Sequence, residues 1–197
     1  MSRRFGLICI VLGICCLLSS VGLVFYNKWD DKKAEETSKQ FLEDIHDQIQ
    51  ENINENTKVE NESLEMLTTK IGNYDCIGVL SIPVLDLELP VLTDWNYTKL
   101  KKAPCHYYGT YYEPDFVIAA HNYPSHFGKL AELQEKDLVL FTDVSGNVYY
   151  YEVVLIETLG ATATNEMITS GFDLSLYTCT VGGGSRVTVR CSKIYLN

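Results

Sequence analysis

Residues 174–190 read LSLYTCTVGGGSRVTVR, a stretch that contains two β-prone runs joined by a glycine-rich link. The first run ends at Cys179, directly after apolar and β-branched residues. Three consecutive glycines follow, and the second run begins at Arg186. Short runs of this kind, bounded by a glycine cluster, predict two β-strands. The cysteine then ends one strand and the arginine starts the next.

The same β-rich texture extends over residues 71–197. Beyond the first run above, the candidate strands are residues 76–82, 87–91, 116–120, 137–141, 147–157 and 186–195. Ser145-Gly146-Asn147 separates two of these strands and is a strong hairpin signal. One short helix is expected near residues 127–133. Seven or eight short strands at this spacing predict a mainly β domain, either a sandwich or a barrel.

The N-terminal zone, residues 1–28, has the pattern of a membrane anchor. Arg3 and Arg4 precede an uncharged stretch from Phe5 to Tyr26, which is long enough to supply the roughly 20 residues that a membrane-crossing helix needs. The basic flank predicts a cytoplasmic N-terminus, with the remainder of the chain outside the cell. A cleaved signal peptide is the alternative, but its apolar core would be shorter, about 7–15 residues. We therefore expect an uncleaved, single-pass anchor in the cell membrane.

The second zone, residues 29–70, is acidic and contains no proline or glycine. An amphipathic helix is expected over residues 32–53, followed by a looser polar segment around residues 54–61. Its apolar residues recur every four positions: Phe41, Ile45, Ile49 and Ile53. One interpretation is a spacer that holds the next domain away from the membrane, and the other is a helix that docks its apolar stripe on that domain. The narrowness of the stripe favours the spacer.

Composition and charge exclude several classes of protein. The chain carries 16 Lys and Arg against 26 Asp and Glu, a formal net charge of −10. Phosphate contacts need basic side chains, so an acidic chain without a basic stripe is expected to bind no nucleic acid. Hydrophobic residues make up 46% of the chain, which excludes disorder over its full length. Only one apolar run is long enough to span a bilayer, which excludes a polytopic membrane protein.

Four of the seven cysteines lie outside the anchor, namely Cys76, Cys105, Cys179 and Cys191. In an extracellular domain they could form two disulfides, with three possible connectivities. Their spacing contains no CxxC pair, so a zinc site is not expected. Cys76 and Cys191 fall within strands and are interpreted as buried free thiols. Cys105 falls in a loop, and the sequence does not decide whether it is a free thiol or part of a disulfide.

Cys179 differs from the other cysteines because a cation follows it at the head of the next strand. A nearby cation stabilises the thiolate, which is the nucleophilic form of the side chain. His121 closes the strand at residues 116–120, and His126 in the following loop competes for the same role. On the residues alone, a Cys–His–Arg catalytic site competes with an inert core cysteine that faces a structural arginine.

At this point the sequence resembles a sortase. Residues 175–179, SLYTC, are similar to the family's Thr-Leu-x-Thr-Cys signature, with serine in place of the first threonine. Residues 186–190, RVTVR, resemble the strand that carries the family's catalytic arginine. His121 matches the family's catalytic histidine at its strand end. Upstream, residues 77–83 (IGVLSIP) and 89–91 (LPV) resemble the family's opening strands, so the resemblance covers about residues 75–195.

The resemblance implies a closed, seven- to eight-stranded sortase-like β-barrel over residues 71–197, preceded by the transmembrane helix and the acidic helical stalk. It implies a cysteine transpeptidase that cleaves a Leu-Pro-x-Thr-Gly-like sorting signal through a thioacyl intermediate. In this scheme Cys179 is the nucleophile, His121 the acid and base, and Arg186 the oxyanion donor. Arg190 is the alternative arginine, and it would otherwise pair elsewhere, for instance with a carboxylate.

The implied partners are surface proteins or pilins that carry a C-terminal sorting signal, together with an amine acceptor on a peptidoglycan precursor or a pilin lysine. No metal or other cofactor is expected. Glu157 and Glu166 could contribute to calcium binding as in some sortases, but solvated loop charges are the favoured interpretation. Residues 160–171 are expected to wall the substrate groove. The alternatives are a membrane-anchored binding domain with an inert cysteine, and a cysteine hydrolase that does not ligate.

Overall fold

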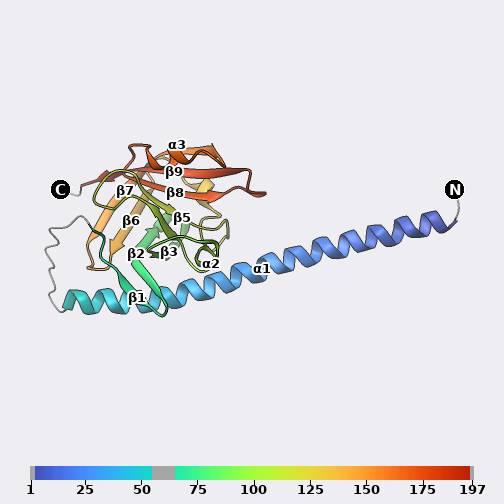
Figure 1. Ribbon diagram of the computed structural model, residues 1–197, viewed down its shortest axis with the longest axis horizontal. Helices are drawn as coiled ribbons and strands as arrows, with labels where there is room; N and C mark the ends of the chain where they lie inside the picture. Colours follow the sequence, from blue (N-terminus) through green and yellow to red (C-terminus); the bar gives the residue numbers. More distant parts are fainter. Residues whose placement is uncertain (1–2, 55–64, 196–197) are drawn as a thin grey trace.

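The computed structural model describes residues 3–54 and 65–195, which form one long helix and a β-barrel (Figure 1). The strands are β1 (Thr69–Ile71), β2 (Tyr74–Ile82), β3 (Leu87–Leu92), β4 (Cys105–Tyr108), β5 (Phe116–Ala119), β6 (Leu138–Asp143), β7 (Val148–Gly160), β8 (Leu174–Cys179) and β9 (Ser185–Ile194). The helices are α1 (Arg3–Asn54), α2 (Tyr97–Leu100) and α3 (Thr164–Ile168), with 3₁₀ turns at Pro83–Leu85 and Leu130–Glu132. The looser segment expected at residues 54–61 lies, beyond Asn54, outside the described residues.

The sheet closes on itself. Its strands follow the order β1-β2-β3-β4-β5-β8-β9-β7-β6, and β6 pairs back onto β2. Within the described residues, β2 to β9 therefore form an eight-stranded closed barrel, and β1 extends the sheet beside the start of β2. Closure leaves the barrel without free edges. The predicted mainly β, barrel-like domain is confirmed.

Gly78 makes the closure possible. It lies in β2 where β6 pairs, with φ at +154°, and a Cβ atom there would lie 2.2 Å from the carbonyl oxygen of Thr142. Only glycine tolerates that backbone conformation and that approach together. The register of β2 also shifts between Cys76 and Gly78, which is the kind of bulge that bends a strand at a barrel corner.

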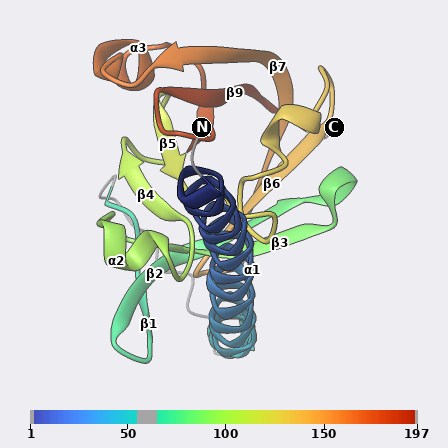
Figure 2. The ribbon, with the colours of Figure 1, turned by 90° about the vertical axis from the view of Figure 1, so that its right-hand side faces the viewer.

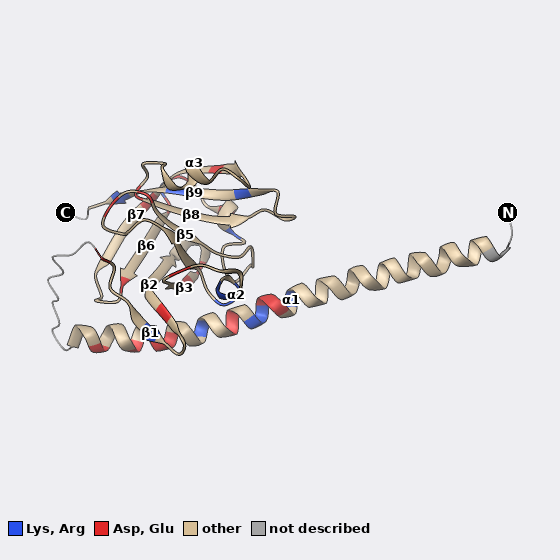
Figure 3. Cartoon of the chain, viewed as in Figure 1, with Lys and Arg blue, Asp and Glu red and all other residues tan. Residues whose placement is uncertain are grey.

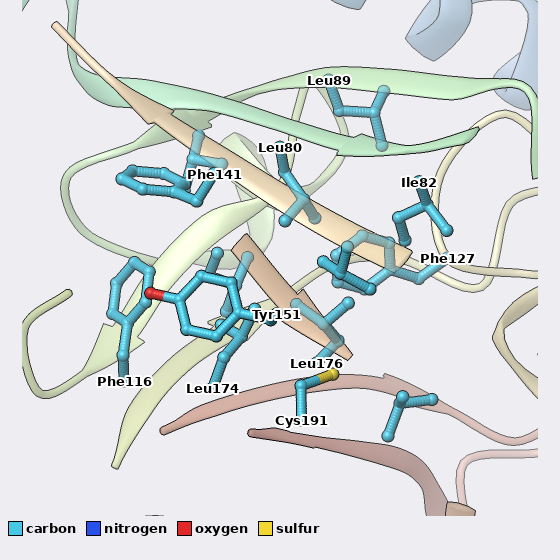
Figure 4. Close-up of a cluster of buried hydrophobic side chains, with 14 of the residues drawn as sticks. Leu80, Ile82, Leu89, Phe116, Phe127, Phe141, Tyr151, Leu174, Leu176 and Cys191 are labelled. Atoms are coloured by element: carbon cyan, nitrogen blue, oxygen red, sulfur yellow. The ribbon is translucent and has the colours of Figure 1, made fainter. Parts of the chain in front are cut away.

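The barrel interior is a packed apolar core (Figure 4). Large side chains from most strands meet there, including Leu80, Phe116, Phe141, Tyr151 and Leu176, all at 1% exposure or less. Every second residue of β8 points inward, as the pleat of a strand requires. Leu174 and Leu176 thus fill the core, and Ser175, Tyr177 and Cys179 project from the opposite face of the sheet.

Most of the predicted strands lie within two or three residues of the observed ones, and the Ser145-Gly146-Asn147 turn joins β6 to β7. Asp143 fixes that turn by accepting hydrogen bonds from the backbone N–H groups of Ser145 and Asn147, each at 2.9 Å. One placement was wrong: Cys105 begins strand β4 and is fully buried, rather than lying in a loop. Helices α2 and α3 were not predicted, because four- and five-residue helices leave no periodic signal.

The apolar stripe of α1 packs against the barrel, contrary to the favoured interpretation of a spacer. Phe41, Ile45 and Ile49 are 9%, 0% and 7% exposed. They belong to a second apolar cluster whose barrel members include Ile71 and Val144. The view along α1 shows the helix running beside β1, β2 and β3 (Figure 2). The docking interpretation is therefore the one that the structure supports.

Replacing Ile45 by alanine is expected to lower the free energy of unfolding by about 2–4 kcal/mol, because it opens a cavity in this fully buried interface. The measurement is denaturant unfolding of the full-length chain in detergent micelles, followed by tryptophan fluorescence. Ile53→Ala is the matched control on the same helix. Ile53 is 50% exposed, so its loss should cost about 1 kcal/mol or less. Equal effects of the two variants would contradict the docked interface.

The first half of α1 projects away from the barrel. Within the described residues, α1 is the one helix that is long and apolar enough to cross a membrane. Its apolar stretch is not buried against the rest of the chain. After the uncharged stretch, charged residues of α1 resume at Lys28 and continue along the docked half (Figure 3). The arrangement fits a single-pass anchor that continues without a break into the docked helix.

Candidate active site

Strand pairing brings the three predicted site residues together. β5 and β8 are parallel, with Ala119 opposite Tyr177, so the same register continued by two residues places His121 beside Cys179. β8 and β9 are antiparallel, and there Cys179 is opposite Arg186. Residues paired in this way project on the same face of a sheet. The cysteine thus lies between the histidine on one side and the arginine on the other.

His121, Cys179 and Arg186 line one pocket at this end of the barrel. Of the four barrel cysteines, Cys179 alone is partly exposed. Burial raises the pKa of the Cys76 and Cys105 thiols to about 12 and also raises that of Cys191, which keeps all three protonated. All seven cysteines lie within the described residues and are free thiols. Only Cys179 combines access to the pocket with a cationic neighbour.

His121 is half-buried at the end of β5, in contact with the ring of Tyr123 at a centroid distance of 4.9 Å. Burial lowers the pKa of His121 below its ordinary value, Lys101 lowers it further, and the Asp30 carboxylate raises it. Its Nε2 atom is buried and has no hydrogen-bond partner within the described part of the chain. Because His121 also lines the pocket, its ring is placed to exchange a proton with a ligand there.

His126, the competing histidine, does not reach the pocket. Its side chain is fully buried, and burial lowers its pKa to about 4, so it is neutral at physiological pH. It packs beside Tyr123 at a ring-centroid distance of 5.7 Å. His126 is thus part of the support beneath the loop and has no access to a substrate.

The two arginines of β9 have different surroundings. Arg190 is 1% exposed, and its Nε donates to a carboxylate oxygen of Glu157 at 2.8 Å. Its other nitrogens donate to the Ser175 hydroxyl and to the carbonyl oxygens of Glu166 and Met167. Arg186 is only partly buried, and it donates to the carbonyl oxygens of Ser185 and Gly183 at 3.2 and 3.4 Å. Arg186 is therefore the arginine that faces the pocket, and Arg190 fixes the underlying structure.

The same contacts bear on the calcium interpretation. The Glu157 carboxylate is engaged by Arg190, and the Glu166 backbone carbonyl accepts from that same guanidinium. An arginine at the carboxylate opposes a divalent cation there, and the structure gives no support for a shared calcium site at these residues.

Two groups of residues line the pocket around the three site residues. Residues 160–171 were expected to line the groove, and Gly160, Ala161, Ala163, Thr164 and Met167 do so. The facing wall is aromatic and was not predicted; it contains Trp95, Tyr97, Tyr107 and Tyr177. Tyr177 lies on the same face of β8 as Cys179, two residues earlier, so strand alternation could have identified it. Trp95 comes from the irregular link after β3 and Tyr97 from the start of the short helix α2, where sequence carries no such signal.

Thr178 ties the cysteine strand to the histidine strand, because its buried hydroxyl donates to the Ala120 carbonyl oxygen at 2.9 Å. Thr178→Val is expected to cost about 1–2 kcal/mol of stability and to lower kcat roughly tenfold, since the Ala120 carbonyl loses its donor and His121 follows it directly. Thr188→Val is the matched control. Thr188 is fully buried and its hydroxyl has no partner in the described residues, so this change should be neutral or stabilising. Thermal unfolding and peptide turnover measure both effects, and a loss from Thr188→Val alone would contradict the assignment.

The comparisons with known proteins agree with this geometry. The Sortase domain model matches residues 80–194, more than half of the chain, so the chain belongs to the sortase family. The family implies a sortase-type cysteine transpeptidase. No curated protein matches the chain.

Several solved structures share the fold. Sortase C1 from Streptococcus suis is 26% identical with a TM-score of 0.54, over 62% of this chain and 74% of that one. Sortase C from Streptococcus pneumoniae is 22% identical with a TM-score of 0.58, over 82% and 97% of the two chains. Sortase A from Corynebacterium diphtheriae is 18% identical with a TM-score of 0.57, over 89% and 97%.

Proposed function

We propose that this protein is a membrane-anchored cysteine transpeptidase that cleaves a Leu-Pro-x-Thr-Gly-like sorting signal and joins the new carboxyl end to an amine. The observation that carries the proposal is the placement of His121, Cys179 and Arg186 around one pocket, with the cysteine in the middle. The two flanking residues can then act on the same reacting carbonyl.

In the first half-reaction, the Cys179 sulfur attacks the carbonyl carbon before the scissile bond, and the thiol proton passes to His121. The bond to the leaving amine breaks, His121 supplies the proton that this amine takes, and a thioester to the enzyme remains. In the second half-reaction, His121 accepts a proton from the incoming amine as its nitrogen attacks the thioester carbonyl. The new amide forms, and Cys179 leaves and takes back the proton that His121 accepted. Two half-reactions of this kind give ping-pong kinetics.

Arg186 stabilises the negative charge that develops on the carbonyl oxygen in both half-reactions. A guanidinium suits this role, because it stays charged and carries several donors in one plane. Its present contacts are two backbone carbonyls at the longer end of hydrogen-bond distance. A substrate oxygen in the pocket can compete with contacts of that length.

The pocket supports recognition of an apolar peptide. Ala161, Ala163 and Met167 on one wall and the aromatic side chains on the other suit the Leu-Pro portion of a sorting signal. The proposed substrates are surface proteins or pilins, and the proposed acceptor is a peptidoglycan amine or a pilin lysine. The N-terminus is proposed to lie in the cytoplasm and the barrel outside the cell.

The test is intact-mass spectrometry of the full-length protein in detergent micelles, mixed with a panel of Leu-Pro-x-Thr-Gly-like peptides. The full chain is required because α1 packs against the barrel. An acyl adduct that an added amine converts into a ligated product is the expected result. Release of free acid in the presence of the amine would instead indicate a hydrolase. A folded protein with no adduct and an unreactive Cys179 would overturn the proposal in favour of a binding domain.

A further inference from the structure

The loop that follows β5, residues 121–128, carries His121 and is held from two sides. From within, Phe127 and His126 are fully buried, and the Phe127 N–H donates to the carbonyl oxygen of His121 at 3.2 Å. The loop also turns back on itself, because the Gly128 N–H donates to the Tyr123 carbonyl oxygen at 2.8 Å. From outside, the contacts come from α1, more than ninety residues away in sequence.

Two consecutive aspartates of α1 make these outer contacts. Asp30 accepts a hydrogen bond from the Tyr123 hydroxyl at 2.5 Å and pairs with the Lys101 ammonium at 3.4 Å. Asp31 accepts from the hydroxyl and the backbone N–H of Ser125, at 2.6 and 3.2 Å. Both carboxylates lie only four or five residues beyond Tyr26, where the uncharged part of the anchor ends.

Tyr123 connects these contacts to the histidine. Its ring packs on the His121 ring, its hydroxyl donates to Asp30, and its ring also contacts the ring of buried His126. The Nε2 atom of His121 has no hydrogen-bond partner within residues 3–54 and 65–195. Ring packing against Tyr123 is therefore a principal constraint on how the imidazole is oriented, and Asp30 holds Tyr123 in place.

We propose that Asp30 and Tyr123 are positioning residues for His121, so that the membrane-anchor helix itself completes the active site. The proposal rests on the proposed function only in giving His121 the acid and base role. The positioning proposal goes beyond the proposed function because it gives α1 a part in the chemistry, in addition to anchoring and packing.

The proposal also predicts a measurable effect on the pKa of His121. Acceptance of the Tyr123 hydrogen bond lowers the pKa of Asp30, so its carboxylate is ionised at neutral pH. That charge raises the pKa of His121, in opposition to burial and to Lys101. Titratable or charged groups surround His121 on the neighbouring elements: Lys28, Asp30 and Asp31 on α1, Tyr97 in α2 and Lys101 after it, Tyr107 on β4, Tyr123 and His126 in its own loop, Tyr177 and Cys179 on β8, and Arg186 on β9. Of these, Asp30 and Lys101 form the opposed pair that variants can separate.

The experiment compares Asp30→Asn, Tyr123→Phe and Asp47→Asn in the full-length chain in micelles. Asp47 is an exposed aspartate of the same helix, away from the loop, and serves as the control for loss of one negative charge. We expect Asp30→Asn and Tyr123→Phe each to lower kcat about fivefold to tenfold with little change in KM. Asp47→Asn should leave both constants unchanged. Because the two positioning residues act through one contact, the double variant should be no worse than the more damaging single variant.

The second readout does not need a substrate. The chain has four histidines, and NMR of histidine-labelled protein follows the titration of each one. Asp30→Asn should lower the pKa of His121, Lys101→Gln should raise it, and Asp47→Asn should leave it in place. A merely structural role for Asp30 would lower thermal stability without producing these opposite shifts.

The two proposals fail separately. If the wild-type chain turns over no peptide, the proposed function fails, and the His121 titration still decides whether the Asp30 charge acts on His121. If Asp30→Asn matches Asp47→Asn in kcat and in the His121 pKa, the positioning role is overturned. Should Asp30→Asn fail to fold, Tyr123→Phe, which keeps the ring and removes only the hydroxyl, decides the question, and wild-type kcat in that variant would overturn the proposal.

Discussion

Cys179→Ala is expected to abolish acyl-enzyme formation and to lower peptide turnover at least about a thousandfold, because no other side chain in the pocket can form the thioester. The fold should be unaffected, since the Cys179 side chain is partly exposed at the end of β8. Intact mass after incubation with the peptide, and turnover with and without an amine, measure the effect.

Cys105→Ala is the matched control. Cys105 is fully buried in β4, and its Sγ lies 3.5 Å from the Ala103 carbonyl oxygen. Its loss should cost about 1 kcal/mol of stability and leave the adduct and the turnover in place. Alkylation should also distinguish the thiols, with Cys179 reacting fastest of the four in the barrel. Adduct formation in Cys179→Ala would exclude it as the nucleophile.

The two arginines of β9 give the second large prediction, in which activity and stability separate. Arg186→Met is expected to lower turnover roughly a hundredfold to a thousandfold, with stability within about 0.5 kcal/mol of wild type. Arg190→Met is expected to cost about 3 kcal/mol, because it leaves the Glu157 carboxylate and two carbonyl groups without their donor. That cost is at the lower end for a buried pair, since the Glu157 side chain is 32% exposed and keeps some contact with solvent.

Thermal unfolding and peptide turnover, measured on the same preparations, distinguish the two roles. At a temperature where Arg190→Met is fully folded, its turnover should stay within a few fold of wild type. If Arg190→Met were stable but inactive and Arg186→Met were active, the catalytic role would belong to Arg190 and the structural role to Arg186. The Glu157→Gln variant adds a check, because it should lower stability in the same direction as Arg190→Met and leave the chemistry intact.

The hairpin of β8 and β9 illustrates what can be predicted from local sequence. Both strands, the turn between them, and the positions of Cys179 and Arg186 at their facing ends follow from a single stretch of 17 residues, 174–190. The choice between Arg186 and Arg190 is different, because they lie on the same face of one strand. What separates them is the Glu157 carboxylate and the α3 carbonyls, which are brought over Arg190 by tertiary structure.

The docked helix illustrates the limit of periodicity. Phe41, Ile45 and Ile49 show as a narrow stripe, and a narrow stripe on an acidic helix is typical of an exposed one. Its partner surface is assembled from residues as distant as Ile71 and Val144, none of which has a pattern that points to the helix. His126 is a similar case. Its burial depends on how the loop folds over the barrel, so sequence alone could not separate it from His121.

The unbroken helix α1 also fixes how far the active site lies from the membrane. From Tyr26, the last residue of the uncharged stretch, to Asp30 there are four residues, which is about 6 Å along the helix axis at 1.5 Å per residue. A helix that is continuous from the membrane span into the docked segment acts as a strut, and it allows far less vertical travel than a flexible tether. With α1 as the anchor, the reaction is confined to a thin layer next to the bilayer. Substrates would then be selected partly by how far their cleavage motif lies from their own membrane span. This selection by distance would precede recognition of substrate side chains in the pocket.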